Sequence, residues 1–113
     1  MKKKLFALFV VFILSVPGCA TVNVTKTGIG FHDPTIPDKV DILMTLPKRG
    51  FVELATVSSS NWAPHEAAKM HNSMRTKCAP LGANAVFISA SGVVGEGLGA
   101  KMWTTGVAIR YTD

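Results

Sequence analysis

The sequence contains few of the residues that make up most catalytic and metal centres. Its 113 residues include only two cysteines and three dispersed histidines. A zinc site needs several cysteine or histidine ligands at short spacings, which this chain does not offer. Neither paired carboxylates nor a serine elbow accompany the histidines, so a general base would have no nucleophile to activate. We therefore predict that the protein is not an enzyme and holds no metal or other cofactor.

Clustered positive charge is absent as well. The formal net charge is +5, but Lys2, Lys3 and Lys4 supply three of the twelve basic residues, and the other nine are scattered among seven acidic ones. A nucleic-acid-binding protein concentrates basic side chains on one surface. The glycine-rich segment Gly95–Ala100 precedes an expected strand rather than a helix, so it lacks the context of a phosphate-binding loop. We predict no nucleic-acid partner and no nucleotide.

The longest apolar run is too short to span a membrane. Leu5–Val16 holds twelve residues, only one of them polar, and Pro17-Gly18 closes it. A membrane-spanning helix needs ~20 apolar residues. A basic head at Met1–Lys4, a short apolar stretch and a small residue before Cys19 are typical of a secretory signal peptide. We therefore assign residues 1–18 to a signal peptide.

Val16-Pro17-Gly18-Cys19 resembles the lipobox of bacterial lipoproteins. The resemblance implies cleavage before Cys19 and attachment of diacylglycerol to its thiol, so that membrane lipid is a partner of the protein. Two or more acyl chains hold a protein stably on a bilayer. Ala20 follows the cysteine where an Asp would mark the inner membrane, which implies the outer membrane, facing the periplasm, if the source is Gram-negative. Simple cleavage or an unmodified Cys19 is the alternative.

Residues 19–39 are predicted to form the lipidated cysteine and a tether. Glycine, proline, threonine and asparagine are frequent in Ala20–Lys39, a composition that favours irregular structure. Twenty fully extended residues reach ~65 Å, so the tether would hold the domain well clear of a bilayer. Within this segment Thr21–Thr25 alternates enough to form a short strand.

Residues 40–113 are predicted to form one small domain that begins with a hairpin. The first strand is expected at Val40–Leu46, with a buried face made of Val40, Ile42, Met44 and Leu46. Phe51–Ser58 favours a second strand, and the turn residues of Pro47–Gly50 join the two. Ser58–Asn61 is predicted to be a loop.

An amphipathic helix is predicted over Pro64–Ala79. Proline suits a first helical turn, and Gly82 is placed to end the helix in the left-handed conformation. Apolar residues recur at spacings of three and four: Ala67, Met70, Met74, Cys78 and Leu81. If Cys19 carries lipid, Cys78 has no partner for an intramolecular disulfide, and we interpret it as a small core residue. A redox thiol or an intermolecular bridge is the alternative.

Two further strands follow the predicted helix, at Ala83–Ser89 and Met102–Thr112, joined by a glycine-rich loop at Gly92–Ala100. Trp103 is expected in the core. The order β-β-α-β-β predicts an α+β fold in which a single helix packs on a four-stranded antiparallel or mixed sheet. The helix would form a crossover, right-handed if its two strands are parallel. A five-stranded sheet that includes Thr21–Thr25 is the alternative.

Trp62 and His65 are the candidate interaction residues. Trp62, just before the helix, is either an exposed aromatic anchor for a partner or a hydrophobic lid over the helix start. His65 is expected at the surface in the first turn. An alternative function uses the His65–His71 region to bind a metal or a small ligand. Met70, His71 and Met74 suit a soft metal such as Cu(I), although both methionines belong to the apolar stripe.

Two stretches, Phe51–Ser58 (FVELATVS) and Leu81–Ile88 (LGANAVFI), flank the predicted helix. Together they resemble small bacterial lipoproteins with a YbjQ-like or RcsF-like β-β-α-β-β core, over about Val40–Thr112. The resemblance implies that fold, and an RcsF-like relative is an envelope-stress sensor whose domain is stapled by disulfides. This chain lacks the cysteines for those disulfides.

From these features together we predict a membrane-tethered lipoprotein of the cell envelope. Its domain would be a non-catalytic interaction or envelope-sensing module with an envelope protein as its partner. The alternative prediction is a periplasmic lipoprotein that binds a metal or a small ligand.

Overall fold

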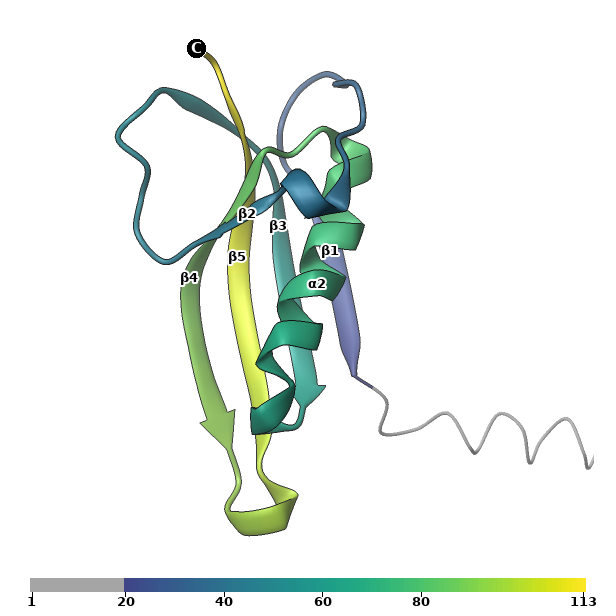
Figure 1. The fold of residues 1–113 in the computed structure, drawn as a ribbon, viewed down its shortest axis with the longest axis vertical. Helices are drawn as coiled ribbons and strands as arrows, with labels where there is room; N and C mark the ends of the chain where they lie inside the picture. Colours follow the sequence, from purple (N-terminus) through teal and green to yellow (C-terminus); the bar gives the residue numbers. More distant parts are fainter. Residues whose placement is uncertain (1–19) are drawn as a thin grey trace, which may run out of the picture.

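Residues 20–113 build a five-stranded sheet with one helix packed on one of its faces (Figure 1). The computed structural model describes residues 20–113, so the predicted signal peptide at residues 1–18 and the predicted lipidation of Cys19 lie outside the described residues. The strands are β1 (Thr21–Lys26), β2 (Asp41–Leu43), β3 (Phe51–Trp62), β4 (Ala85–Val94) and β5 (Lys101–Tyr111), and the helix is α2 (Ala67–Cys78). Short 3-10 turns lie at Pro37–Lys39, Pro64–Glu66, Ala79–Leu81 and Gly97–Gly99.

Across the sheet the strand order is β1-β3-β5-β4-β2. β5 pairs antiparallel with both β3 and β4, so these two strands are parallel to each other with β5 between them. β1 pairs antiparallel with β3 at one edge, and β2 pairs parallel with β4 at the other. The predicted α+β class is confirmed in its five-stranded form, and so is the crossover through the helix.

The helix lies where the sequence predicts it. Pro64–Glu66 forms its first turn, and the Glu66 carboxylate accepts a hydrogen bond from the Ala63 N–H at 3.0 Å. That bond is the main reason why the pKa of Glu66 is lowered. The helical stretch continues through Ala79–Leu81 and ends at Gly82, whose φ of +89° is the left-handed conformation that glycine adopts without strain.

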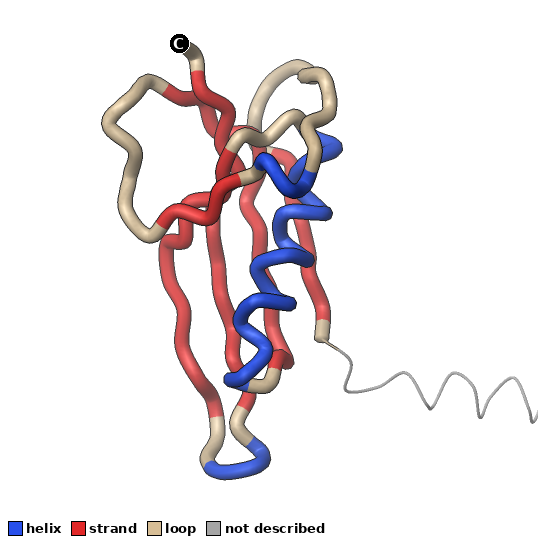
Figure 2. Tube along the Cα trace, in the orientation of Figure 1, coloured by secondary structure: helices blue, strands red, loops and turns tan. Residues whose placement is uncertain are grey.

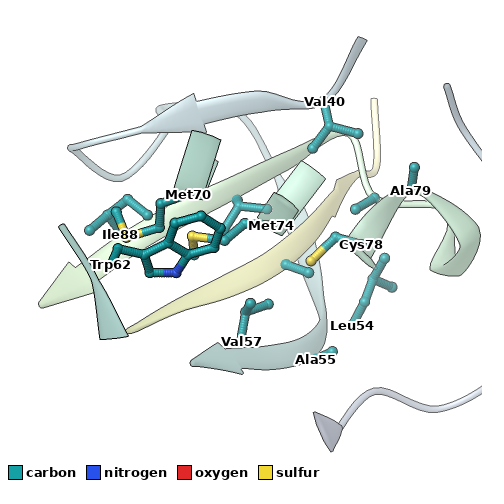
Figure 3. Packing of buried hydrophobic residues seen from close by; sticks show 13 residues of the cluster. Val40, Leu54, Ala55, Val57, Trp62, Met70, Met74, Cys78, Ala79 and Ile88 are labelled. Atoms are coloured by element: carbon teal, nitrogen blue, oxygen red, sulfur yellow. The ribbon is translucent and has the colours of Figure 1, made fainter. Parts of the chain in front are cut away.

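The predicted apolar stripe of α2 forms the centre of the core (Figure 3). Met70, Met74 and Cys78 are exposed by no more than 2% of their surface. They pack against the sheet, where the buried partners include Leu54, Val57, Val86, Ile88 and Ala108. Lys69, Asn72 and Lys77, predicted on the wet side, are exposed.

The predicted hairpin between Val40–Leu46 and the next strand is wrong. Only Asp41–Leu43 forms a strand, and it pairs parallel with β4 at the far edge from β3. Val40 is buried as expected, but Met44 and Leu46 are 64% and 62% exposed. The segment after β2 crosses to β3 past the end of β5, where Arg49 stacks on the Tyr111 ring and pairs with Asp113 at 2.7 Å.

The predicted tether is also corrected, because most of it belongs to the domain. Thr21–Lys26 is the edge strand β1, and the N–H groups of Thr27 and Gly28 donate to the Leu54 carbonyl at 3.0 and 2.9 Å. Further along, the Thr35 N–H donates to the Ala79 carbonyl at 2.8 Å. The folded unit therefore includes residues from Thr21 onward and not only those from Val40, so Ala20–Lys39 is not a fully extended tether with a reach of ~65 Å.

The predicted loops around the helix and after β4 are shorter than expected. Ser58–Asn61 belongs to β3, since Ser58, Ser59 and Ser60 pair with β1. β4 continues through Gly92 to Val94, so six of the nine residues of the expected glycine-rich loop remain between the strands. Figure 2 shows this remainder as a tan segment with a single blue turn at Gly97–Gly99.

Candidate functional site

Trp62 is a core residue, and its ring is not exposed as an aromatic anchor would be. It is the last residue of β3 and is 9% exposed. Its indole N–H donates to the Ser59 hydroxyl, and Figure 3 shows the ring beside Met70 and Ile88. The interpretation of Trp62 as a hydrophobic lid over the helix start is therefore the correct one. His65 is exposed in the turn before α2, as expected.

The His65–His71 region does not assemble a metal site in the structure. Within residues 20–113, no three His, Cys, Asp or Glu side chains come close enough to hold one ion. Met70 and Met74, the soft ligands considered for Cu(I), are buried in the core. Partial burial, together with the charge of Arg75, lowers the pKa of His71.

Cys78 lies in the core, as the sequence predicts, and its burial makes its reactivity testable. The side chain has no exposed surface, and burial raises the pKa of the thiol to about 12. We expect Cys78 to resist alkylation at neutral pH until the protein is denatured, because the reactive thiolate does not form. Peptide mapping of the alkylated protein gives the measurement. Rapid native labelling of Cys78, or a disulfide-linked dimer in cells, would instead show a redox or bridging residue.

The same shift sets a pH dependence of folding. Above the ordinary thiol pKa of 9.0 the unfolded chain ionises at Cys78, whereas the folded chain does so only near 12. The contribution of the Cys78 thiol to the free energy of unfolding should therefore be complete below pH ~9 and should decrease as the pH rises toward 12. Denaturant titrations at stepwise pH measure it. Cys78→Ala should cost about 1 kcal/mol at pH 7 and remove this part of the pH dependence.

The sheet face opposite α2 carries a second set of apolar side chains, which we call the open face. Side chains alternate along a strand, and Val86, Ile88 and Ala108 belong to the core under α2. Their neighbours in β4 and β5 therefore point the other way. Phe87, Trp103 and Val107 on that face are half-buried, and within residues 20–113 no helix covers them (Figure 1). Trp103, expected in the core, is thus a surface residue.

The open face is shaped by one glycine and bordered by polar residues. Gly92 pairs with Trp103, and a Cβ at Gly92 would come within 2.9 Å of the Trp103 ring, so only glycine lets the indole lie against β4. On β3, the exposed residues Thr56 and Ser58 pair with Val107 and Thr105. An apolar centre with a polar border is the general layout of a protein interface.

A shallow pocket of about 330 Å³ lies at the end of the sheet where β4 turns into β5. We call this end, with residues 93–101, Ala20 and the last residues of β3, the hairpin end. The pocket is lined by Ser60, Asn61, Val94, Gly95, Gly99, Lys101, Met102 and Trp103. Asn61 has a positive φ of +66°, which asparagine tolerates better than most residues. Beside the pocket, Leu98 is 107% exposed and Val94 is 63% exposed.

The sequence did not indicate the open face or the pocket. Alternation in Met102–Thr112 placed Trp103 and Val107 on one face, but it did not show which face meets the helix. The pocket depends on residues from three strands, which only the sheet order brings together.

Comparison with known proteins shows what the fold is similar to. No family model matches the chain, and no curated protein matches it. Among solved structures, the crystal structure of the Francisella virulence factor FvfA superposes with a TM-score of 0.56 over 80% of this chain and 98% of that one, at 13% sequence identity. At this identity the likeness concerns the fold alone. The α+β arrangement of one helix on a sheet described above is thus shared with a bacterial virulence factor.

Proposed function

We propose that the protein is a membrane-tethered bacterial lipoprotein whose domain is a non-catalytic interaction module of the cell envelope. The lipobox-like Val16–Cys19 segment and the basic, apolar start of the chain support the anchor. The fold likeness to a bacterial virulence factor agrees with a bacterial source. An envelope protein is the proposed partner, and an outer-membrane location facing the periplasm follows if the cell is Gram-negative.

The open face is the observation that carries the interaction role. Phe87, Trp103 and Val107 form a half-buried apolar centre on the two adjacent strands β4 and β5. A contiguous apolar patch with a polar border on a small domain commonly marks a protein contact. The domain is also small, and burying this face against a partner would add apolar area that its own core lacks.

The anchor would place this face in a fixed orientation. β1 begins at Thr21, two residues after Cys19, and lies at the sheet edge against β3. Lipid on Cys19 would therefore hold the hairpin end of the sheet next to the bilayer, with the strands running away from it. A partner would meet the open face within a few nanometres of the membrane, not at the end of a flexible tether.

The anchor is tested by replacing the acylated residue. Cys19→Ser should remove the protein from the membrane fraction or cause the precursor to accumulate, because no acyl chain can be attached to the serine. Fractionation with mass measurement of the intact chain reads this out. Cys78→Ala is the matched control and should leave the protein in the membrane. Unchanged fractionation and mass of Cys19→Ser would contradict the anchor.

The interaction role is tested by site-specific photo-crosslinking in intact cells. A benzophenone amino acid in place of Phe87 should form adducts with an envelope protein, whereas the same group in place of the exposed Lys77 on α2 should not. Val107→Lys should abolish the Phe87-site adduct without changing the melting temperature, because Val107 is only half-buried. Equal adducts from both positions, or none from either, would argue against an interface on the open face.

A small-ligand role is the second candidate, and the pocket at the hairpin end favours it. Its volume of about 330 Å³ is at the small end of the range for ligand sites, and its lining combines Trp103 and Met102 with Asn61 and Lys101. A ligand that binds only the folded protein raises the melting temperature. A screen of small anions and metabolites that finds such a rise, lost in Lys101→Ala, would favour this candidate over the interaction module.

A further inference from the structure

We propose that the tip of the β4–β5 hairpin, residues 93–100, enters the headgroup region of the bilayer that holds lipid on Cys19. The hairpin would form a second membrane contact beside the anchor and would fix the orientation of the domain. This inference rests on the proposed lipid anchor.

The sheet register places the hairpin tip at the same end as the anchor. Thr21 pairs with Ser60 near the end of β3, and Trp62 at that end pairs with Met102 of β5. Ala20, Trp62 and Met102 are therefore at about the same level along the strands. The tip continues beyond this level, and Figure 1 shows it as the lowest point of the described chain. A surface that reaches an anchor at Cys19 would meet the tip first.

The tip carries apolar side chains that the fold does not use. Leu98 is 107% exposed, and Val93 and Val94 are 56% and 63% exposed. None of the three belongs to the core under α2. Gly95 and Gly97 in the tip have φ angles of +91° and +60°, a conformation that glycine adopts without strain. Transfer of such apolar side chains from water to the boundary between headgroups and acyl chains is favourable.

The charges near the tip fit a shallow contact. Glu96 is the one charged residue of the tip, and Lys101 follows the tip directly, so residues 93–101 together carry no net charge to repel a membrane surface. Lys101 lies on the pocket rim, where its ammonium group could stay among headgroups while its methylenes follow the apolar side chains. Amphipathic helices at a membrane interface insert only ~5–10 Å, and insertion of the tip to a similar depth would leave the rest of the sheet in water.

Other exposed apolar side chains lie at the opposite end of the sheet. Ile29 and Phe31 are 98% and 94% exposed in the loop that follows β1. β1 is six residues long, which separates this loop from the hairpin end by ~20 Å. These residues cannot reach the same bilayer if the tip is inserted. Ile29 therefore provides a control with the same exposure as Leu98.

The test places an environment-sensitive dye at each end of the full-length, processed protein. Leu98→Cys and Ile29→Cys are each labelled with a nitrobenzoxadiazole dye, while the buried Cys78 stays unreacted. Each protein is reconstituted into phosphatidylethanolamine–phosphatidylglycerol vesicles, with or without spin-labelled lipid. We expect blue-shifted emission and at least a twofold quenching for the dye at position 98, and neither for the dye at position 29.

The other possible results of the dye experiment distinguish failure of the tip contact from failure of the lipid anchor. If the protein floats with the vesicles but neither dye is quenched, the anchor holds and the membrane contact of the tip is wrong. Equal quenching at both positions would show a domain lying on its side, which also overturns the proposal. Failure of the protein to float with the vesicles contradicts the lipid anchor itself. In a second variant, Leu98→Asp with the dye at Val94→Cys, quenching should be lost while flotation is kept.

Discussion

Met74→Asp is expected to lower the free energy of unfolding by at least about 3 kcal/mol, which is the scale for a buried charge left without a partner. Met74 has no exposed surface and lies at the middle of α2 between Met70 and Cys78. Within residues 20–113 the buried polar side chains are Ser59 and Thr104, so no buried basic side chain is there to pair with the aspartate. A domain of this size has only ~5–15 kcal/mol of stability in total, so this loss is a large share of it and should lower the melting temperature strongly.

Two matched variants separate the charge effect from other causes. Lys77→Asp introduces the same side chain on the exposed side of α2 and should change stability by less than about 0.5 kcal/mol. Met74→Leu keeps the volume and the apolar character and should cost less than about 1.5 kcal/mol. Urea unfolding followed by circular dichroism measures all three. Similar midpoints for Met74→Asp and Lys77→Asp would mean that α2 packs through a different face.

Gly106→Ala is expected to produce the second large loss of stability. Gly106 lies in β5, the central strand, and a Cβ there would come within 2.8 Å of the Phe87 carbonyl oxygen and 3.1 Å of Val86 Cγ1. The carbonyl belongs to a paired backbone that cannot move without breaking the β4–β5 ladder. Overpacking of this kind costs ~1–3 kcal/mol, which corresponds to a fall of roughly 5–20 °C in melting temperature for a domain of this length.

Gly99→Ala is the control for this experiment. A Cβ at Gly99 meets no atom within 4 Å, and its φ is not positive. Both variants add one methyl group at a glycine, so any difference in melting temperature comes from the surroundings. Thermal scans that give the same melting temperature for the two variants would show that β4 and β5 separate more easily than the register implies.

The features that the sequence predicted well are those that depend on neighbours in the chain. The stripe of α2, the first-turn Pro64 and the terminal Gly82 all act over four residues or fewer, so their effect is visible in the sequence. The burial of Cys78 followed directly from the helix phase.

The features that failed depend on residues far apart in the sequence. Val40–Leu46 alternates like a strand of a hairpin, but the part that forms a strand, Asp41–Leu43, pairs with Ala85–Phe87. After Leu43 the chain leaves the sheet edge, so the alternation no longer determines which side chains are buried. Ser58–Ser60 has the composition of a loop. These serines are held in β3 because β1 pairs along one side and β5 along the other, an effect that no local propensity expresses.

The candidate site shows the same division. Trp62 was placed correctly beside the helix start, but whether its ring faced water depended on Ser59 accepting its N–H and on Met70 covering it. Trp103 was expected in the core, but it is half-buried on the opposite face of the sheet. It lies on the open face because it alternates with Met102, which packs against the core under α2, and Gly92 leaves room for its ring there.

The central position of β5 also determines when a growing chain can fold. β3 and β4 are synthesised earlier, yet they have no hydrogen bonds to each other and meet only through Lys101–Tyr111, the last strand in the described chain. Before that strand leaves the ribosome, α2 has no continuous sheet to pack on. The pairing of β3 with β5 also joins strands that are far apart in the sequence, and such pairings form slowly. In an exported chain, which the proposed lipid anchor requires, late closure of the sheet would leave β3 and β4 unjoined while the polypeptide passes through a secretion channel. The domain can then close in one step on the far side of the membrane.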